Sequence, residues 1–419
     1  MMRLLILTGA LLCCPIAGFA QSIPNTDVYA ALPLDTARER AVVNSPDVAA
    51  ATARVRQNQA ALAAARAAFG PAITSSYTEA PQGGPRGTIA QRLTTVGAQT
   101  TLGELITRSP AIRQAESNVL AAQLELQAAR RSEQVKVIGL YYDALRASAT
   151  MRAREGALRS VEADRSAAQK RFSAGDAPQL DIVRAQVAFA RATADLENAR
   201  AVSDNATEAL AVEAGIAVAS LASIAPANQV VIETVSQDPA RATQIAFASR
   251  PEIAAAQANV RAQESAVRVA QRGVLPAVTL IAGYTNGVDS GVHVAGPNIS
   301  AQVALPIAGA ARARIAGERG RLEEAQAKLA AEQRRVSLEV SGAVRTFLAS
   351  GRARIAATNA REQAQAQLAA TSVGYRNGAT SSLEVTAARQ TYIQAILDEL
   401  SAIYAVAQAR ATLRLQIGP

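Results

Sequence analysis

The 419-residue chain has no Trp, only 3% aromatic residues and two cysteines. A conventional single-core globule of this size would need many large apolar side chains to fill its interior, so the shortage of aromatics excludes that class. The hydrophobic fraction is still 49%. Much of it is alanine, which is the smallest apolar side chain and the best helix former. The composition therefore favours thin, helix-on-helix packing.

Lysine is also scarce, although the chain is basic. The formal net charge is +9, from 43 Lys and Arg against 34 Asp and Glu, and the lysines are Lys136, Lys170 and Lys328. The arginines are spread along amphipathic segments among Glu and Gln, and do not gather in a patch with aromatics. This distribution disfavours a nucleic-acid footprint, so we predict no nucleic-acid partner.

Residues 1–20 are typical of a secretory signal peptide. An early Arg is followed by an apolar run over 4–16 and by small residues that predict cleavage after Ala20. Both cysteines, Cys13 and Cys14, lie inside this segment. Lipidation of one of them is an alternative, disfavoured because neither follows a small residue. A cleaved chain would have no cysteine, so we expect neither disulfides nor thiolate metal sites.

No other stretch of about 18 apolar residues follows, so no transmembrane helix is predicted. The rest of the chain is a tandem duplication. An offset of 205 aligns 44–50 with 249–255, and an offset of 203 aligns 172–175 with 375–378. We therefore predict, after the signal peptide, a first repeat over 21–215, a linker or equatorial segment over 216–240 and a second repeat over 241–419.

Proline placement predicts one long helix in each repeat, over 108–172 and 310–374, each on the order of 100 Å long. Both carry a seven-residue apolar repeat, which indicates a partner alongside. It runs through Ile112, Val119 and Leu126, and through Ile315, Leu322, Leu329 and Val336. Shorter helices are predicted over 34–68, 179–213, 241–274 and 383–416. Two short helices laid end to end match one long helix, which predicts a wall of closely packed helices.

Each repeat also contains an insert with strand-like, period-two patterning. Residues 276–306 read as two strands separated by a turn-rich segment at 286–298, and 72–101 show a weaker version of the same pattern. Four strands cannot close a barrel alone, and lipid does not tolerate an open sheet edge. Three chains would supply twelve strands, enough for a membrane barrel with a water-filled interior.

Paired motifs follow the two long helices: RFSAGDAPQLD over 171–181 and GYRNGATSSLEV over 374–385. With the duplication, they resemble the helical tips of the TolC family of outer-membrane efflux proteins, and the likeness covers essentially the whole mature chain. The resemblance implies a mainly α homotrimer, with tandem-duplicated long helical hairpins forming an α-barrel across the periplasm. Four β-strands per protomer would complete a twelve-stranded barrel in outer-membrane lipid.

The same resemblance implies a function and partners. The trimer would be the exit duct of a tripartite efflux pump or a type I secretion system, gated at its periplasmic tip. An inner-membrane transporter would supply energy and a periplasmic adaptor (membrane fusion protein) would dock at the tip. The duct itself would need no cofactor and no metal, and would catalyse nothing.

Three side chains are the predicted gate. The resemblance implies that acidic residues constrict the closed tip, which points to Asp181 and Glu384, and threefold symmetry would make Glu384 a cation-favouring ring. Interaction with the helix dipole is the alternative role for both carboxylates. A second acidic residue expected one turn later is absent, since Arg184 and Ala387 stand there. The acidic constriction is therefore expected to be weaker or differently placed.

Tyr375 matches a family aromatic that latches the closed tip between neighbouring hairpins, with Asp181 as its expected partner; simple packing beside Gly378 is the alternative. Phe172 is the corresponding aromatic of the first repeat. Gly175 and Gly378 are predicted to close the tip turns in a left-handed conformation, and ordinary helix capping explains them as well as gating does.

Two other classes of function compete with the channel. A soluble periplasmic coiled-coil adaptor or structural protein would also be helical, but its β-domains would flank one hairpin, whereas here each repeat has an insert between a short and a long helix. An enzyme is disfavoured, because His293 is the only histidine and no metal-binding, phosphate-binding or triad motif is visible.

Overall fold

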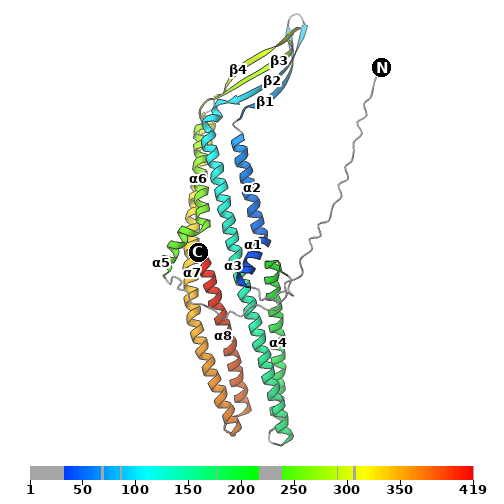
Figure 1. Cartoon of the computed structure of the whole chain (residues 1–419), viewed down its shortest axis with the longest axis vertical. Helices are drawn as coiled ribbons and strands as arrows, with labels where there is room; N and C mark the ends of the chain where they lie inside the picture. Colours follow the sequence, from blue (N-terminus) through cyan, green and yellow to red (C-terminus); the bar gives the residue numbers. More distant parts are fainter. Residues whose placement is uncertain are drawn as a thin grey trace, which may run out of the picture.

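The computed structural model describes residues 33–418, apart from 68–69, 85–86, 176, 217–237, 290 and 305–307. The predicted signal peptide and nearly all of the predicted linker lie outside these residues. The described chain is elongated, with four strands at one end and two helix–helix turns at the other (Figure 1). Between these ends the helices run side by side.

The elements of the first repeat recur in the same order in the second. The first repeat contains α1 (Leu34–Asn44), α2 (Pro46–Ala67), β1 (Ala72–Gly84), β2 (Gly87–Thr101), α3 (Leu102–Ser173) and α4 (Gln179–Ala214). The second contains α5 (Pro239–Ser249), α6 (Pro251–Arg272), β3 (Ala277–Asp289), β4 (Val292–Ala304), α7 (Ala308–Arg376) and α8 (Ser382–Ile417). The long helices α3 and α7 have 72 and 69 residues.

The prediction of single helices over 34–68 and 241–274 is wrong, because each segment is broken at a proline. Ser45 and Arg250 are extended, with ψ of 123° and 124°. Pro46 and Pro251 then begin new helices. Proline lacks a backbone N–H and disfavours helical conformation in the residue before it, so the chain bends at the same point in both repeats.

The predicted pairing of long and short helices is confirmed. One long helix, α3, packs along α2 over its upper part and along α4 over its lower part, and α7 packs in the same way along α6 and α8 (Figure 1). The two repeats meet where α3 packs against α6 and α8. Small alanine side chains on these helices allow close approach over the whole length.

Two hydrophobic clusters lie at mid-height, where the short helices meet the long ones. In the first, Ala37 and Ala41 of α1 pack with Val137 of α3 and Leu210 of α4. In the second, the corresponding alanines of α5, Ala242 and Ala246, pack with valines of α7 and with leucine and isoleucine of α8. The first cluster also contains Tyr404 of α8, so it links the two repeats at mid-height.

The strands form one antiparallel sheet in the order β1-β2-β3-β4, so the two repeats join through β2 and β3. The predicted turn over 286–298 is too long. Pairing continues to the Asp289–Val292 pair, which leaves only residues 290–291 between the strands. Polar and glycine residues of this stretch lie on both faces of the paired strands, so periodicity alone reads the stretch as a loop.

The two faces of the sheet differ in character. Registered pairs on one face are apolar, such as Ala282 with Ile299 and Val96 with Tyr284. On the other face the hydroxyls of Thr95 and Thr285 lie 2.9 Å apart, and this face is mostly threonine, serine, glutamine and glycine. Within the described residues, no helix has the length and apolarity to cross a bilayer.

Candidate functional site at the helical tip

The turns that close the two long hairpins end in left-handed glycines. Gly175 has φ of 84° and its amide donates to the carbonyl of Phe172 at 3.0 Å. Gly378 has φ of 75° and its amide donates to the carbonyl of Tyr375 at 3.1 Å. Glycine adopts this conformation without the Cβ clash that other residues suffer, so each long helix can end abruptly.

Glu384 forms a capping box at the start of α8. Its carboxylate accepts a 2.7 Å hydrogen bond from the backbone N–H of Ser381, and the Ser381 hydroxyl accepts from the N–H of Glu384 at 3.4 Å. These bonds satisfy helix N-terminal N–H groups that have no partner within the helix. The side chain is exposed. Glu384 therefore stabilises the helix start, and its place in a ring stays a prediction.

Asp181 joins the two hairpins of one chain. Its carboxylate accepts a 2.6 Å hydrogen bond from the hydroxyl of Ser382, which lies at the start of α8. The guanidinium of Arg184 lies 3.6 Å from the same carboxylate and donates to the Ser382 hydroxyl at 3.3 Å. The three side chains thus form a small network across the gap between α4 and α8, and the Asp181 carboxylate is largely buried in it.

Tyr375 lies in a different contact from the one that the sequence suggests. The guanidinium carbon of Arg171 stands 4.8 Å from the centre of its ring, a cation–π contact between the ends of α3 and α7. Within the described chain, the hydroxyl that reaches Asp181 belongs to Ser382. A bond from Tyr375 to Asp181 of a neighbouring chain stays a prediction. Phe172, at the matching position of the first repeat, is exposed.

A groove of about 860 Å³ opens between the two hairpins above the turns. Six arginines and three aspartates line it, over a floor of alanine, valine and isoleucine. Arg389 of α8 reaches Asp164 of α3 at 2.9 Å and also donates to Ser160, while Arg154 pairs with Asp195 at 2.8 Å. Burial raises the pKa of Asp164, and Arg389 opposes that shift. The excess of arginine leaves the groove electropositive.

Sequence reasoning missed Ser382, Arg389 and Arg171, because their partners are remote in the chain. Asp181 and Ser382 are 201 residues apart, and Arg389 and Asp164 are 225 apart. Spacing within one helix reveals contacts at three or four residues only, as for Asp181 and Arg184. Alignment of the two repeats places the starts of α4 and α8 at matching positions. This alignment is the sequence signal that could have identified the contact between Asp181 and Ser382.

The fold and the duplicated tip agree with comparisons to known proteins. The model of the outer membrane efflux protein family matches residues 37–215 and 242–419, one block in each repeat. The chain belongs to this family. Family membership makes it an outer-membrane channel protein that extends into the periplasm. The relatives are channels and not enzymes, which is consistent with the prediction of no catalytic activity.

Individual relatives are distant in sequence and close in fold. The chain is 26% identical over 326 residues to protein CyaE of Bordetella pertussis, covering 73% of this chain and 67% of that protein. It superimposes on the structure of CusC with a TM-score of 0.82 at 19% identity, covering 93% of each chain. The outer membrane protein VceC of Vibrio cholerae gives 0.77 at 21% identity, covering 92% of this chain and 96% of VceC.

Proposed function

We propose that three copies of this efflux protein form a passive duct that is gated at the helical tip. The supporting observation is the pair of open edges of the sheet. Among the described strands, β1 pairs only with β2 and β4 only with β3, which leaves 13 residues of edge on each side. Unpaired backbone groups facing lipid cost several kcal/mol each, so the edges of neighbouring copies must pair. Twelve strands make a barrel wide enough for a water-filled lumen.

The helices extend this duct away from the membrane. A helix of 72 residues is about 100 Å long, and it begins one residue after β2 ends. Exposed apolar side chains on α4, among them Leu180, Val183 and Val187, supply a surface for a neighbouring copy. The apolar sheet face would meet lipid and the hydroxyl-rich face would line the lumen. An adaptor that docks at the tip and an inner-membrane transporter that supplies the energy would complete the assembly.

Native mass spectrometry of the full chain released from detergent micelles tests the assembly. We expect the mass of three processed chains, together with stepwise conductance when the protein is added to planar bilayers. A monomer with no conductance would contradict the duct and would favour the soluble adaptor or structural protein. Cell fractionation separates the same alternatives, because the duct must sediment with outer membranes.

Site-specific crosslinking tests the adaptor. A photoreactive residue at Asn377, exposed in the tip turn, is expected to capture a periplasmic adaptor when the chain is expressed with its partner system. The matched control is the same residue at Gln57, exposed on α2 far from the tip, which should capture none. Capture at Gln57 and not at Asn377 would move the docking surface away from the tip.

A further inference from the structure

A buried pair of carboxyl groups lies at mid-height of the first repeat, outside the tip site. Glu133 of α3 is only 4% exposed, and its Oε2 accepts a 2.9 Å hydrogen bond from the hydroxyl of Ser45, the residue at the break between α1 and α2. Its other oxygen, Oε1, is buried and has no donor among the described residues. The carboxyl of Glu213, in the last turn of α4, lies within hydrogen-bonding reach of Glu133.

Two carboxylates cannot hydrogen-bond each other unless one carries a proton. If both were ionised, Glu133 would be a buried anion with one oxygen unsatisfied and a like charge in contact, which is costly. The other charged groups around the pair are Lys136 of α3, which contacts Glu213 at 2.6 Å, Asp47 of α2 and Arg38 of α1. Arg38 is engaged by Asp35 and Gln134, and Lys136 is the cation that contacts the pair.

The corresponding part of the second repeat contains a buried permanent charge and, within the described residues, no pair of carboxyl groups. Arg250 stands where Ser45 stands in the first repeat, and its guanidinium donates to Glu339 of α7 at 2.7 Å and to the backbone carbonyl of Gln416 at 3.0 Å. Gln416 matches Glu213, 203 residues earlier. Arg250 supplies a positive charge here, and Gln416 places an amide where the first repeat has the carboxyl group of Glu213. The contact between the end of α8 and the α5–α6 break therefore needs no proton.

In both repeats, side-chain hydrogen bonds fix the C-terminal end of the last helix, α4 or α8, to the break between the two short helices. The side-chain amide of Asn44 donates to the carbonyl of Ala214 at 3.0 Å, and the hydroxyl of Ser249 donates to the carbonyl of Ile417 at 2.9 Å. The anchors therefore correspond, but the buried charged group beside them is the Glu133 carboxyl in the first repeat and the Arg250 guanidinium in the second.

We propose that Glu133 and Glu213 form a proton-binding site that holds the C-terminal end of α4 against α3 and the α1–α2 break. One proton bridges the two carboxyl groups and satisfies Glu133 Oε1. Loss of the proton leaves two negative charges in contact and loosens this anchor. Because α4 begins at the tip, the anchor also sets how firmly the α3–α4 hairpin is held.

The electrostatics assign the proton to Glu133. Burial raises the pKa of Glu133, contact with Glu213 raises it further, and the Ser45 hydrogen bond opposes the shift. The hydrogen bond with Glu133 lowers the pKa of Glu213, and Lys136 adds to that effect. A raised pKa means that the stabilisation is present below the ordinary pKa of Glu and is lost as pH rises through the raised value. The anchor is therefore weakened on the high-pH side of the raised pKa.

Hydrogen exchange of the full chain in detergent tests the site. After correction for intrinsic exchange rates, protection of the α4 amides at 210–214 is expected to fall with rising pH, by about tenfold for each unit by which the pKa is raised. Glu133→Gln should make this profile flat, because the amide accepts from Ser45 and donates to Glu213 without titrating. The α8 amides at 413–417, which are anchored by Arg250, are the internal control and should show no such fall.

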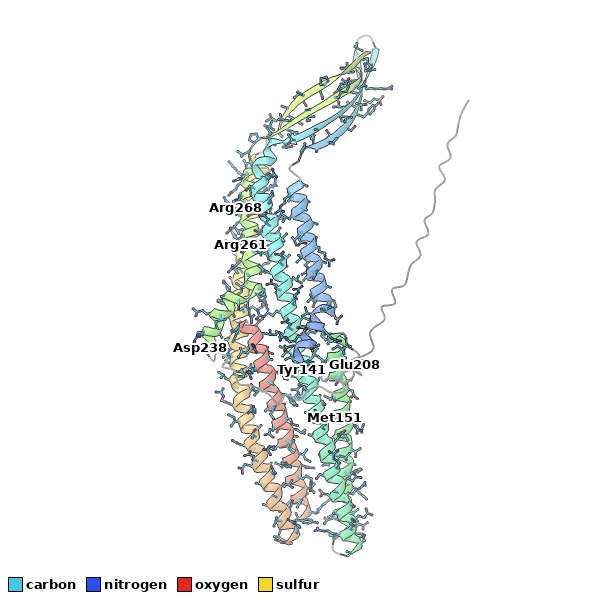
Figure 2. The ribbon with its side chains drawn as sticks, in the orientation of Figure 1. Tyr141, Met151, Glu208, Asp238, Arg261 and Arg268 are labelled. Carbon is cyan, nitrogen blue, oxygen red and sulfur yellow. The ribbon has the colours of Figure 1, made fainter. Side chains whose placement is uncertain are left out.

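Two further variants keep the test decisive. Glu208→Gln changes an exposed carboxylate on the same helix, labelled in Figure 2, and should retain the parental profile. If Glu133→Gln does not fold, Glu213→Gln tests the site from α4, since its amide would donate to the Glu133 carboxylate and reduce the loss of protection with rising pH. The parent should also show the infrared carbonyl band of a protonated carboxyl at pH values above the ordinary pKa of Glu. The proposal would be overturned if folded Glu133→Gln kept the parental exchange profile, or, where only Glu213→Gln folds, if that variant kept it. Absence of the infrared band in the parent would also overturn it.

Discussion

Gly97 of β2 stands directly opposite Gly283 of β3, across the seam that joins the two repeats. A Cβ on Gly97 would lie 2.7 Å from the carbonyl oxygen of Ala282 and 2.9 Å from the Cα of Gly283. A Cβ on Gly283 would meet the backbone of β2 equally closely. The two strands therefore approach and coil in a way that only glycine allows at these positions.

Replacing this glycine tests the seam. Gly97→Val should push β2 and β3 apart and reduce the yield of folded, heat-resistant oligomer, measured by gel mobility with and without heating. Ala98→Val is the matched control, because the adjacent Ala98 is exposed on the apolar face and tolerates a larger apolar side chain. Equal yields of the two variants would show that the close approach is not required.

The capping box allows the charge of Glu384 to be tested without disturbing the start of α8. Glu384→Gln keeps a side-chain acceptor for the Ser381 N–H and removes the charge, so α8 should still begin at the same residue. If three copies place this side chain around the pore axis, the variant should lower the cation preference of the channel. The measurement is the reversal potential in planar bilayers across a salt gradient.

A second substitution separates charge from capping. Glu384→Ala removes both, and leaves the backbone N–H of Ser381 without its side-chain acceptor. A shift in reversal potential shared by both variants would reflect the charge. An unchanged reversal potential in Glu384→Gln would leave Glu384 with a capping role only.

The hydroxyl of Tyr375 can be tested without disturbing its ring. Tyr375→Phe keeps the surface that lies under Arg171, so the cation–π contact within the chain should survive. If the hydroxyl latches neighbouring chains through Asp181, combining Tyr375→Phe with Asp181→Ala should raise the open probability of the channel above that of the parent. Identical gating in the double variant and the parent would remove the latch.

Much of the fold follows from local sequence rules. The absence of proline over long stretches predicts α3 and α7 to within about six residues at each end. The starts of α4 and α8 follow from their positions after the tip glycines. The repeat offset identifies equivalent positions because duplicated segments keep the same contacts. These features depend on neighbouring residues only, so a single sequence contains them.

Most of the errors and omissions arise where the deciding contact is between residues that are far apart in the sequence. Residues 286–298 read as a turn because their glycines, asparagine and proline lack strand propensity, yet pairing with β2 and within the β3–β4 hairpin makes most of them strand. The sequence does not identify Ser382 as the partner of Asp181, because any of several polar side chains near the tip could have faced the Asp181 carboxylate. The break at Pro46, in contrast, was local and readable, and the helix prediction overlooked it.

The hydrogen bond between Ser382 and Asp181 gives the last prediction. Ser382→Ala removes the only hydroxyl that spans α4 and α8 in the Asp181 network of the described chain, and leaves the carboxylate with Arg184 on its own helix. A partly buried hydrogen bond to a charged group contributes about 1.5–3 kcal/mol. The two hairpins of one chain should therefore separate more readily, and the channel should open more often in planar bilayers. Ser382→Thr keeps the hydroxyl and should gate like the parent. Equal open probability in all three proteins would mean that this bond does not restrain the tip.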